Sequence, residues 1–183
     1  MFSRGRHLLV TVLAIGFLLA VAAPASAVEE RAGSARAIAA ANGFEYRVLL
    51  AVNSVRARHG LRPLRLRRSL SAAAAQHSRE MARLGYFSHT SLDGSPFWKR
   101  VKRHYGMGRH SYWSVGENLL WSSSEIDAAE AVRRWMRSPK HRANLLTPRW
   151  RDLGLGAVRA AAAPRAFQGL DVTILTAEFG VRS

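Results

Sequence analysis

The fold is decided near the C-terminal end, by LGLGAVR at residues 153–159 and LDVTILTAEF at residues 170–179. Both runs are short, and both carry glycine or β-branched residues. An Ala- and Pro-containing connection separates them, which is the pattern of two strands in an antiparallel pair. Residues 116–121 favour a third strand. The strands follow the helical segments instead of alternating with them, so the chain order predicts an α+β fold.

Helical patterns dominate the chain before these strands. Large apolar residues recur at helical spacing from Phe44 to Val55 and again from Leu70 to Leu84. Gly60 and Gly85 are the expected stops, and Ser69 is the expected N-cap of the second helix. Three further cap signals predict short helices that begin at Ser95-Pro96, at Ser124 with Asp127, and at Ser138-Pro139.

The composition limits the kind of site that the chain can build. The chain has 183 residues and no cysteine. It therefore has no disulfide framework, no thiolate metal site and no cysteine nucleophile. A chain of about 150 residues buries roughly 70% of its unfolded surface, so one domain can hold its own core without covalent links.

The N-terminal segment has the pattern of a secretory signal peptide. Arg4 and Arg6 precede an apolar run of 16 residues at 8–23, and Ala25-Ser26-Ala27 offers a cleavage site. The interpretation is a signal peptide over 1–27, a flexible leader over 28–43 and one domain over 44–183. A retained N-terminal anchor is the alternative. We expect the mature chain to have no membrane span and to be secreted, extracellular or held in the cell envelope.

The chain is strongly basic, with 28 Lys and Arg against 12 Asp and Glu and a net charge of +16. Removal of residues 1–27 would leave +14. One interpretation is attraction to an anionic polymer, and the other is a solvated surface. The charges are scattered along the chain, which favours the second. Export argues against nucleic acid as the partner.

Three segments carry residue types that support chemistry. They are FSHTS at residues 87–91, GENL at 116–119, and WMRSPKHR at 135–142 with Asn144 close behind. Each places a His or a Glu within or beside apolar residues. Imidazole and carboxylate groups together can share a proton or hold a divalent cation.

With these segments the chain resembles the CAP superfamily, the cysteine-rich secretory, antigen 5 and pathogenesis-related 1 proteins, and in particular its short, cysteine-free bacterial members. The resemblance covers about residues 46–181. It also includes the opening helix and loop and the two late strands, through Asn53, Arg56, Gly60-Leu61, Pro63-Leu64, Leu153-Gly154-Leu155-Gly156 and Glu178-Phe179-Gly180. It implies an α-β-α sandwich around a small central antiparallel sheet, with a central cleft.

The resemblance also implies a site. His89, Glu117 and His141 match the two family histidines and the first family glutamate, while Ser138 stands at the position of the second glutamate. The three remaining residues imply a site for a divalent, zinc-like metal completed by water. A hydrogen-bonded trio that orders the cleft without a metal is the other interpretation. The first-turn position of His141 in its helix favours a neutral ring.

The leading functional hypothesis is a secreted binding module whose ligand is a lipid, a cell-wall polymer or a protein. No catalytic or cofactor-binding residue is identified, because the sequence lacks Gly-x-Ser-x-Gly, His-Glu-x-x-His and phosphate-loop motifs. One alternative is a metal-dependent hydrolase with Glu117 as base. Another is a structural envelope protein retained by its positive charge. We expect a monomer, and we expect His77 to be a core histidine.

Overall fold

The computed structural model of the protein describes residues 43–183. The predicted signal peptide at 1–27 lies outside the described residues, as does the predicted leader at 28–43 apart from Gly43, which begins a helix over residues 43–58. Among the described residues, no helix is long and apolar enough to cross a membrane.

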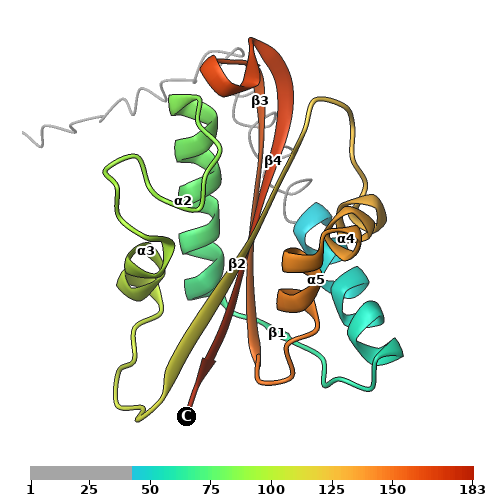
Figure 1. Cartoon of the computed structure of the whole chain (residues 1–183), viewed down its shortest axis with the longest axis vertical. Helices are drawn as coiled ribbons and strands as arrows, with labels where there is room; N and C mark the ends of the chain where they lie inside the picture. The colour runs from blue at the N-terminus through green and yellow to red at the C-terminus, as the bar shows by residue number, and fades with distance from the viewer. Residues whose placement is uncertain (1–42) are drawn as a thin grey trace, which may run out of the picture. The chain divides into compact units, whose positions relative to one another are not determined.

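A four-stranded sheet lies between two helical layers (Figure 1). The strands, in the order β1-β3-β4-β2, are β1 (Arg65–Leu66), β3 (Asp152–Ala163), β4 (Leu170–Arg182) and β2 (Trp113–Ser122). The helices of one layer are α2 (Arg68–Leu84) and α3 (Phe97–His104). The other layer holds the helix over 43–58, α4 (Ala128–Arg137) and α5 (Pro139–Leu145). The predicted α+β class and α-β-α sandwich are confirmed.

The central strand β4 pairs antiparallel with both β2 and β3. Its register places Glu178 opposite Glu117 on β2 and opposite Gly154 on β3. The two late strands and the third strand were therefore predicted correctly. The two-residue strand β1 was not predicted, because it forms only through parallel pairing with residues 152 and 153 of β3.

The glycines of LGLG allow α2 to pack directly on the backbone of β3. A Cβ at Gly154 would lie 2.1 Å from the carbonyl carbon of Leu70, and one at Gly156 would lie 2.2 Å from the backbone nitrogen of Ala75. Contacts this short leave no room for any side chain. The glycines thus set the distance between α2 and the sheet.

Three of the predicted helix starts differ from the structure by local geometry. One is the start of α3, where Pro96, not Ser95, is the N-cap. Arg67, not Ser69, precedes α2 as its N-cap, because Arg67 N is bonded to Leu153 O and the chain stays extended to that point. Asp127, not Ser124, caps α4 by accepting a hydrogen bond from Glu130 N at 2.7 Å. The predicted stop at Gly85 is confirmed, since this residue adopts φ 69°.

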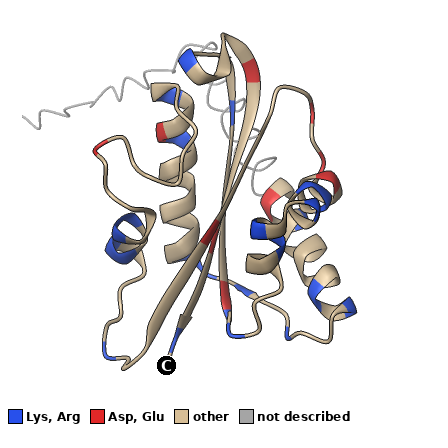
Figure 2. Ribbon diagram, viewed as in Figure 1, with Lys and Arg blue, Asp and Glu red and all other residues tan. Residues whose placement is uncertain are grey.

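Each face of the sheet has its own core. Leu155, Leu175 and Phe179 pack with Trp135 of α4 on one face. Ile174 and Leu119 pack with Met81 of α2 on the other. Lys and Arg lie mainly on the helices and connections (Figure 2). Charged residues within the central strands are exceptions to this distribution.

Candidate functional site

The site begins with two carboxylates buried side by side in the sheet. Glu117 and Glu178 face each other across the β2–β4 pair, with side chains 1% and 0% exposed. Two buried carboxylates repel each other unless a cation lies between them or one holds a proton. Here a cation lies beside both carboxylates, and the pKa of one of them is raised.

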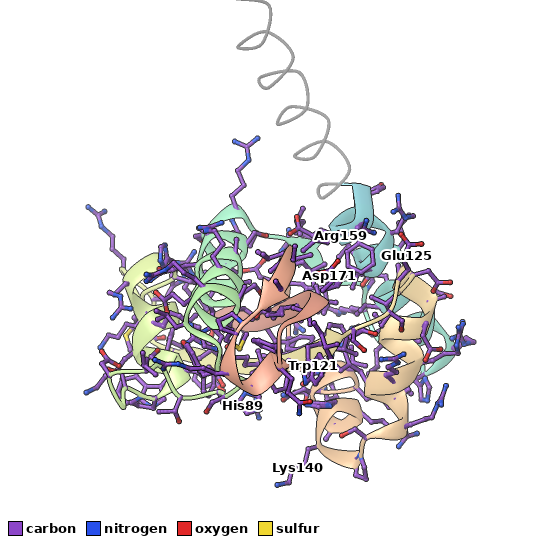
Figure 3. The ribbon with its side chains drawn as sticks, turned by 90° about the horizontal axis from the view of Figure 1, so that it is seen from above. His89, Trp121, Glu125, Lys140, Arg159 and Asp171 are labelled. Atoms are coloured by element: carbon purple, nitrogen blue, oxygen red, sulfur yellow. The ribbon has the colours of Figure 1, made fainter. Side chains whose placement is uncertain are left out.

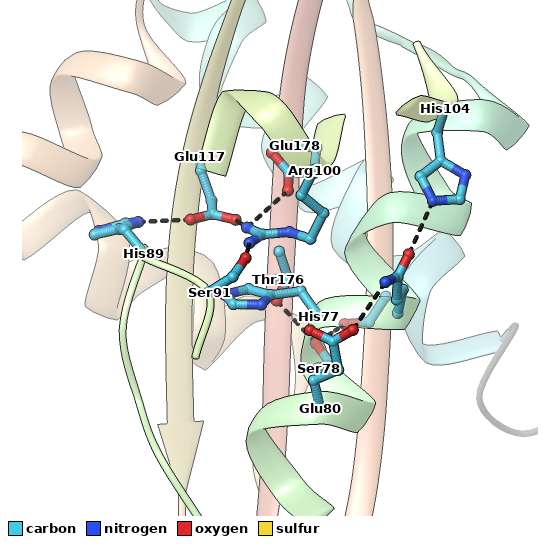
Figure 4. A network of polar contacts seen from close by, with 12 residues as sticks. His77, Ser78, Glu80, His89, Ser91, Arg100, His104, Glu117, Thr176 and Glu178 are labelled. Carbon is cyan, nitrogen blue, oxygen red and sulfur yellow. Dashed lines mark hydrogen bonds and ion pairs between the residues drawn. The ribbon is translucent and has the colours of Figure 1, made fainter. Parts of the chain in front are cut away.

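The cation is Arg100 of α3, whose side chain is fully buried. Its Nη2 donates to Oε2 of Glu117 and lies 3.6 Å from Oε1 of Glu178. Its Nη1 donates to the hydroxyl of Ser91 at 2.9 Å (Figure 4). One guanidinium therefore joins α3, the loop after α2 and two strands of the sheet.

The pKa values of the two carboxylates are shifted in opposite directions. Burial opposes the ionisation of Glu117, but the hydrogen bond from His89 and the contacts with Glu178 and Arg100 outweigh it and lower its pKa. Burial raises the pKa of Glu178 well above its ordinary value, and the charge of Glu117 raises it further. The opposite shifts make Glu117 the carboxylate that carries the charge and Glu178 the one that more readily holds a proton.

His89 connects this buried group to solvent. Its Nδ1–H donates to Oε1 of Glu117 at 2.7 Å, while its side chain is 53% exposed. A carboxylate on one ring nitrogen fixes the tautomer and leaves the other nitrogen as an acceptor. Nε2 of His89 is therefore the basic atom that the site offers to a ligand.

Two asparagines hold His141 near this group. Nδ2 of Asn118 donates to the backbone oxygen of His141 at 3.0 Å, and Nδ2 of Asn144 donates to the backbone oxygen of Glu117 at 2.9 Å. These bonds fasten α5 to β2. Burial lowers the pKa of the His141 ring, and proximity to His89 lowers it further. The lowered pKa favours the neutral ring, and its main cause is burial.

The structure thus brings His89 and Glu117 into direct contact and places His141 within electrostatic range of His89. Within residues 43–183, no three His, Asp or Glu side chains lie close enough together to hold a metal ion. Both oxygens of Glu117 are already bonded, one to His89 and one to Arg100. A three-ligand site does not fit this arrangement unless Glu117 moves, and the metal assignment stays a prediction.

Sequence reasoning left Arg100 and Glu178 out of the site. Glu178 did give a signal, because it is a charged residue between the apolar residues Ala177 and Phe179 and lies in one of the quoted motifs. Arg100 gave none, since it lies among several basic residues of a short helix. His77 is buried as predicted, and its Nε2–H donates to Ser88 O at 2.9 Å, which holds the loop that carries His89.

Comparison with known proteins agrees with this architecture. The model of the cysteine-rich secretory protein family, CAP, matches residues 49–174. The uncharacterized protein YkwD of Bacillus subtilis (strain 168) is 33% identical over 141 residues, which is 76% of this chain and 52% of that protein. The chain therefore spans about half the length of this relative.

Two solved bacterial structures share the fold. An extracellular protein with an SCP domain from Bacillus anthracis str. Ames is 27% identical with a TM-score of 0.58, over 75% of this chain and 40% of that one. An outer surface protein of Borrelia burgdorferi is 18% identical with a TM-score of 0.55, over 74% of this chain and 90% of that one. The second likeness concerns the fold alone.

Proposed function

The chain belongs to the cysteine-rich secretory protein (CAP) family, and we propose that it is an exported, non-catalytic module that binds an amphiphile with an anionic head. The observation that carries the proposal is a groove between the helix over 43–58 and α4, with a volume of about 570 Å³. We refer to it as the α4 groove. It is lined by Ala51, Ser54, Val55, Arg58, His59, Ala129, Val132, Arg133, Met136 and Arg137.

The α4 groove combines an apolar floor with a cationic rim. Val55, Val132 and Met136 supply aliphatic surface along the space between the helices. Ligand sites of this kind are mostly apolar, with a few polar groups that fix orientation. A hydrocarbon chain fits the floor.

The rim carries more positive charge than its neighbours cancel. Arg133 and Arg137, with side chains 57% and 71% exposed, share the single carboxylate of Glu130 at 2.9 and 3.7 Å. Arg58 donates to the hydroxyl of Ser54 at 2.8 Å, and no carboxylate of the described residues pairs with it. Guanidinium groups bind carboxylate and phosphate in bidentate fashion, which favours an anionic head.

A second hollow extends the α4 groove along α5. It has a volume of about 530 Å³, shares Met136 and Arg137 with the first, and adds Arg142 and Leu146. The two together line their apolar surface with Arg58, Arg133, Arg137 and Arg142, which supports a ligand that is apolar along its length and anionic at one end.

The polar site at His89 supports a binding role over a hydrolytic one. A hydrolase needs a base that reaches its substrate and donors that stabilise developing charge. His89 could supply a base, but Glu117 is buried, and Arg100 is buried and already donates to Glu117 and Ser91. Purified protein is therefore expected to show no protease or esterase turnover above a His89→Ala control, and turnover that the control abolishes would contradict the non-catalytic proposal.

A fluorescent fatty acid provides the test of the α4 groove. Ala129, an exposed residue that lines it, should block the space when changed to Trp, so that binding of the probe falls. Ala72→Trp on the exposed face of α2 is the matched control and should bind as wild type does. Arg58→Gln should weaken a fatty acid more than the corresponding alcohol, because only the acid pairs with the guanidinium. Equal binding by the Ala129→Trp and Ala72→Trp proteins would contradict the proposal.

Export is tested separately. The basic start, apolar run and Ala25-Ser26-Ala27 support cleavage that leaves Val28 as the first residue. Mass spectrometry of protein recovered outside the cytoplasmic membrane should then find a chain that begins near Val28. Recovery of an intact 1–27 segment there would favour the retained anchor instead.

The net charge of +16 supports a second candidate role, retention on an anionic envelope. Contacts between exposed charges are screened within about 8 Å at physiological ionic strength. Release of the protein from envelopes by salt would favour retention by charge, whereas release only by detergent would favour an amphiphile held in the α4 groove.

A further inference from the structure

We propose that the outer edge of β3 binds an extended, acidic peptide segment as an added strand of the sheet. The surface consists of the backbone of residues 157–161 and the groove between β3 and α2. It lies away from both the α4 groove and the polar site, and Arg159 and His89 fall on opposite sides of the β3–β4 hairpin in the view from above (Figure 3). The proposal is independent of the proposed function.

The topology leaves this edge open among the described residues. Strand β3 pairs with β4 along its inner side, but on its outer side it pairs only with β1, at residues 152 and 153. Beyond that point no described strand covers it. An unpaired strand edge is a template for hydrogen bonding by another chain.

Side chains show which backbone groups face outward. Leu155 N donates to the hydroxyl of Ser71 at 3.2 Å, and Ala157 N donates to Oε1 of Glu45 at 2.7 Å. Alternate residues of a strand direct their backbone groups to opposite edges. By the same alternation Arg159 directs its N–H and C=O outward, and no side chain within residues 43–183 bonds to them. The edge is therefore capped up to Ala157 and open beyond it.

A groove of about 430 Å³ runs beside the open edge. Its floor is made of small apolar residues, Ala82 of α2 with Val158, Ala160 and Ala163 of β3, and its walls carry Arg79 and Arg83 of α2. An added strand would direct alternate side chains into this groove. The small floor residues leave room for aliphatic side chains.

The positive charge near this edge indicates an acidic partner. Arg79 and Arg83 are exposed and form no ion pair with any described carboxylate. Arg159, on the strand itself, is 73% exposed and reaches only Glu125, at 3.9 Å. An added strand that alternates Glu or Asp with aliphatic residues would direct its aliphatic side chains onto the groove floor. Its acidic side chains would then lie on the opposite face of the sheet, where Arg159 lies, which is the pattern of strand addition to a sheet edge.

The test uses a short synthetic peptide of alternating Glu and Val, with its Lys and Val counterpart as control. We expect the acidic peptide to bind and the basic one not to bind, as measured by fluorescence anisotropy. Hydrogen exchange should slow at the amide of Arg159 when the acidic peptide is present, while the amide of Ala157, already bonded to Glu45, should change little. Exchange that slows elsewhere but not at Arg159 would overturn the proposal.

Two variants separate backbone pairing from attraction by charge. Arg159→Pro removes the outward N–H at an edge position, where proline is tolerated, and should weaken the peptide roughly tenfold. Arg159→Glu keeps this N–H but reverses the charge and should weaken the peptide several-fold, whereas Arg103→Glu on the exposed face of α3 should not. Equal weakening by Arg159→Glu and Arg103→Glu would show attraction by net charge alone and overturn the proposal. A concentration-dependent dimer that Arg159→Pro abolishes would assign the edge to a second copy of the chain and overturn it as well.

Discussion

Arg100 of α3 and Glu117 of β2 form an ion pair, and their side chains are 0% and 1% exposed. The pair joins this helix to the face of the sheet that it covers. Glu117 is one of the residues that the sequence predicts as metal ligands. One of its oxygens is bonded to a protein cation and the other to His89.

Removal of Arg100 should be strongly destabilising. Arg100→Leu would leave Glu117 buried without its cation, a change that costs about 3–5 kcal/mol when a buried pair is broken. Urea denaturation checks this, with Arg103→Leu on the exposed face of α3 as the control. If both variants lose the same stability, the buried pair does not contribute as we infer.

The stability of the protein should depend on pH through Glu178, which faces Glu117 and Arg100. Because its folded pKa lies above the ordinary value of 4.5, the folded chain binds this proton more tightly than the unfolded chain. Its contribution to stability is therefore complete below about pH 4.5 and is lost as the pH rises through the folded pKa. Glu178→Gln cannot ionise, so its stability relative to wild type should improve as the pH rises above about 4.5.

Glu117 should behave with the opposite sign. Its folded pKa is lowered, so its contribution is present above the ordinary value of 4.5 and is lost as the pH falls. Glu117→Gln should therefore be less stable than wild type at neutral pH and approach it in acid. Unfolding free energies of both variants across this pH range provide the measurement, and identical pH profiles would contradict the assignment of charge to one carboxylate and a proton to the other.

Any side chain at Gly154 should force α2 away from the sheet. Gly154→Ala would place a Cβ 2.1 Å from the backbone of Leu70, which no rotamer change can relieve. We expect a loss of about 1–3 kcal/mol, the usual cost of overpacking. The control is Gly43→Ala, whose Cβ would meet only the end of the Arg47 side chain at 3.3 Å. A neutral result at Gly154 in thermal denaturation would mean that α2 does not pack as closely as described.

Zinc should bind weakly, since Arg100 and His89 occupy Glu117 and the two imidazoles are the groups left to bind it. Ligand rings must be neutral, so binding should fade below about pH 6. Titration calorimetry of wild type, His89→Ala and His141→Ala should find binding reduced in both variants. Binding that persists unchanged in the double variant would show that these residues form no metal site.

Much of the candidate site could be predicted from the sequence, because its residues lie in distinctive local segments. His89 and Glu117 come from two such segments and meet as the motifs implied. Arg100 and Glu178 could not be assigned to the site in the same way. Arg100 reaches Glu117 from 17 residues away, and nothing in a helix rich in basic residues distinguishes the one that turns inward.

Features that depend on local interactions could be read from the order of residues alone. Gly85 ends α2 because it adopts a left-handed conformation, Ser138 precedes α5 and Pro139 begins it, and the apolar patterns of β2, β3 and β4 specify strands. Features that depend on distant partners required the folded chain. Strand β1 exists only because residues 65 and 66 meet residues 152 and 153, and α2 begins where that pairing ends. The raised pKa of Glu178 likewise depends on its neighbours, because only the folded chain buries this carboxyl and brings a second carboxylate and a guanidinium beside it.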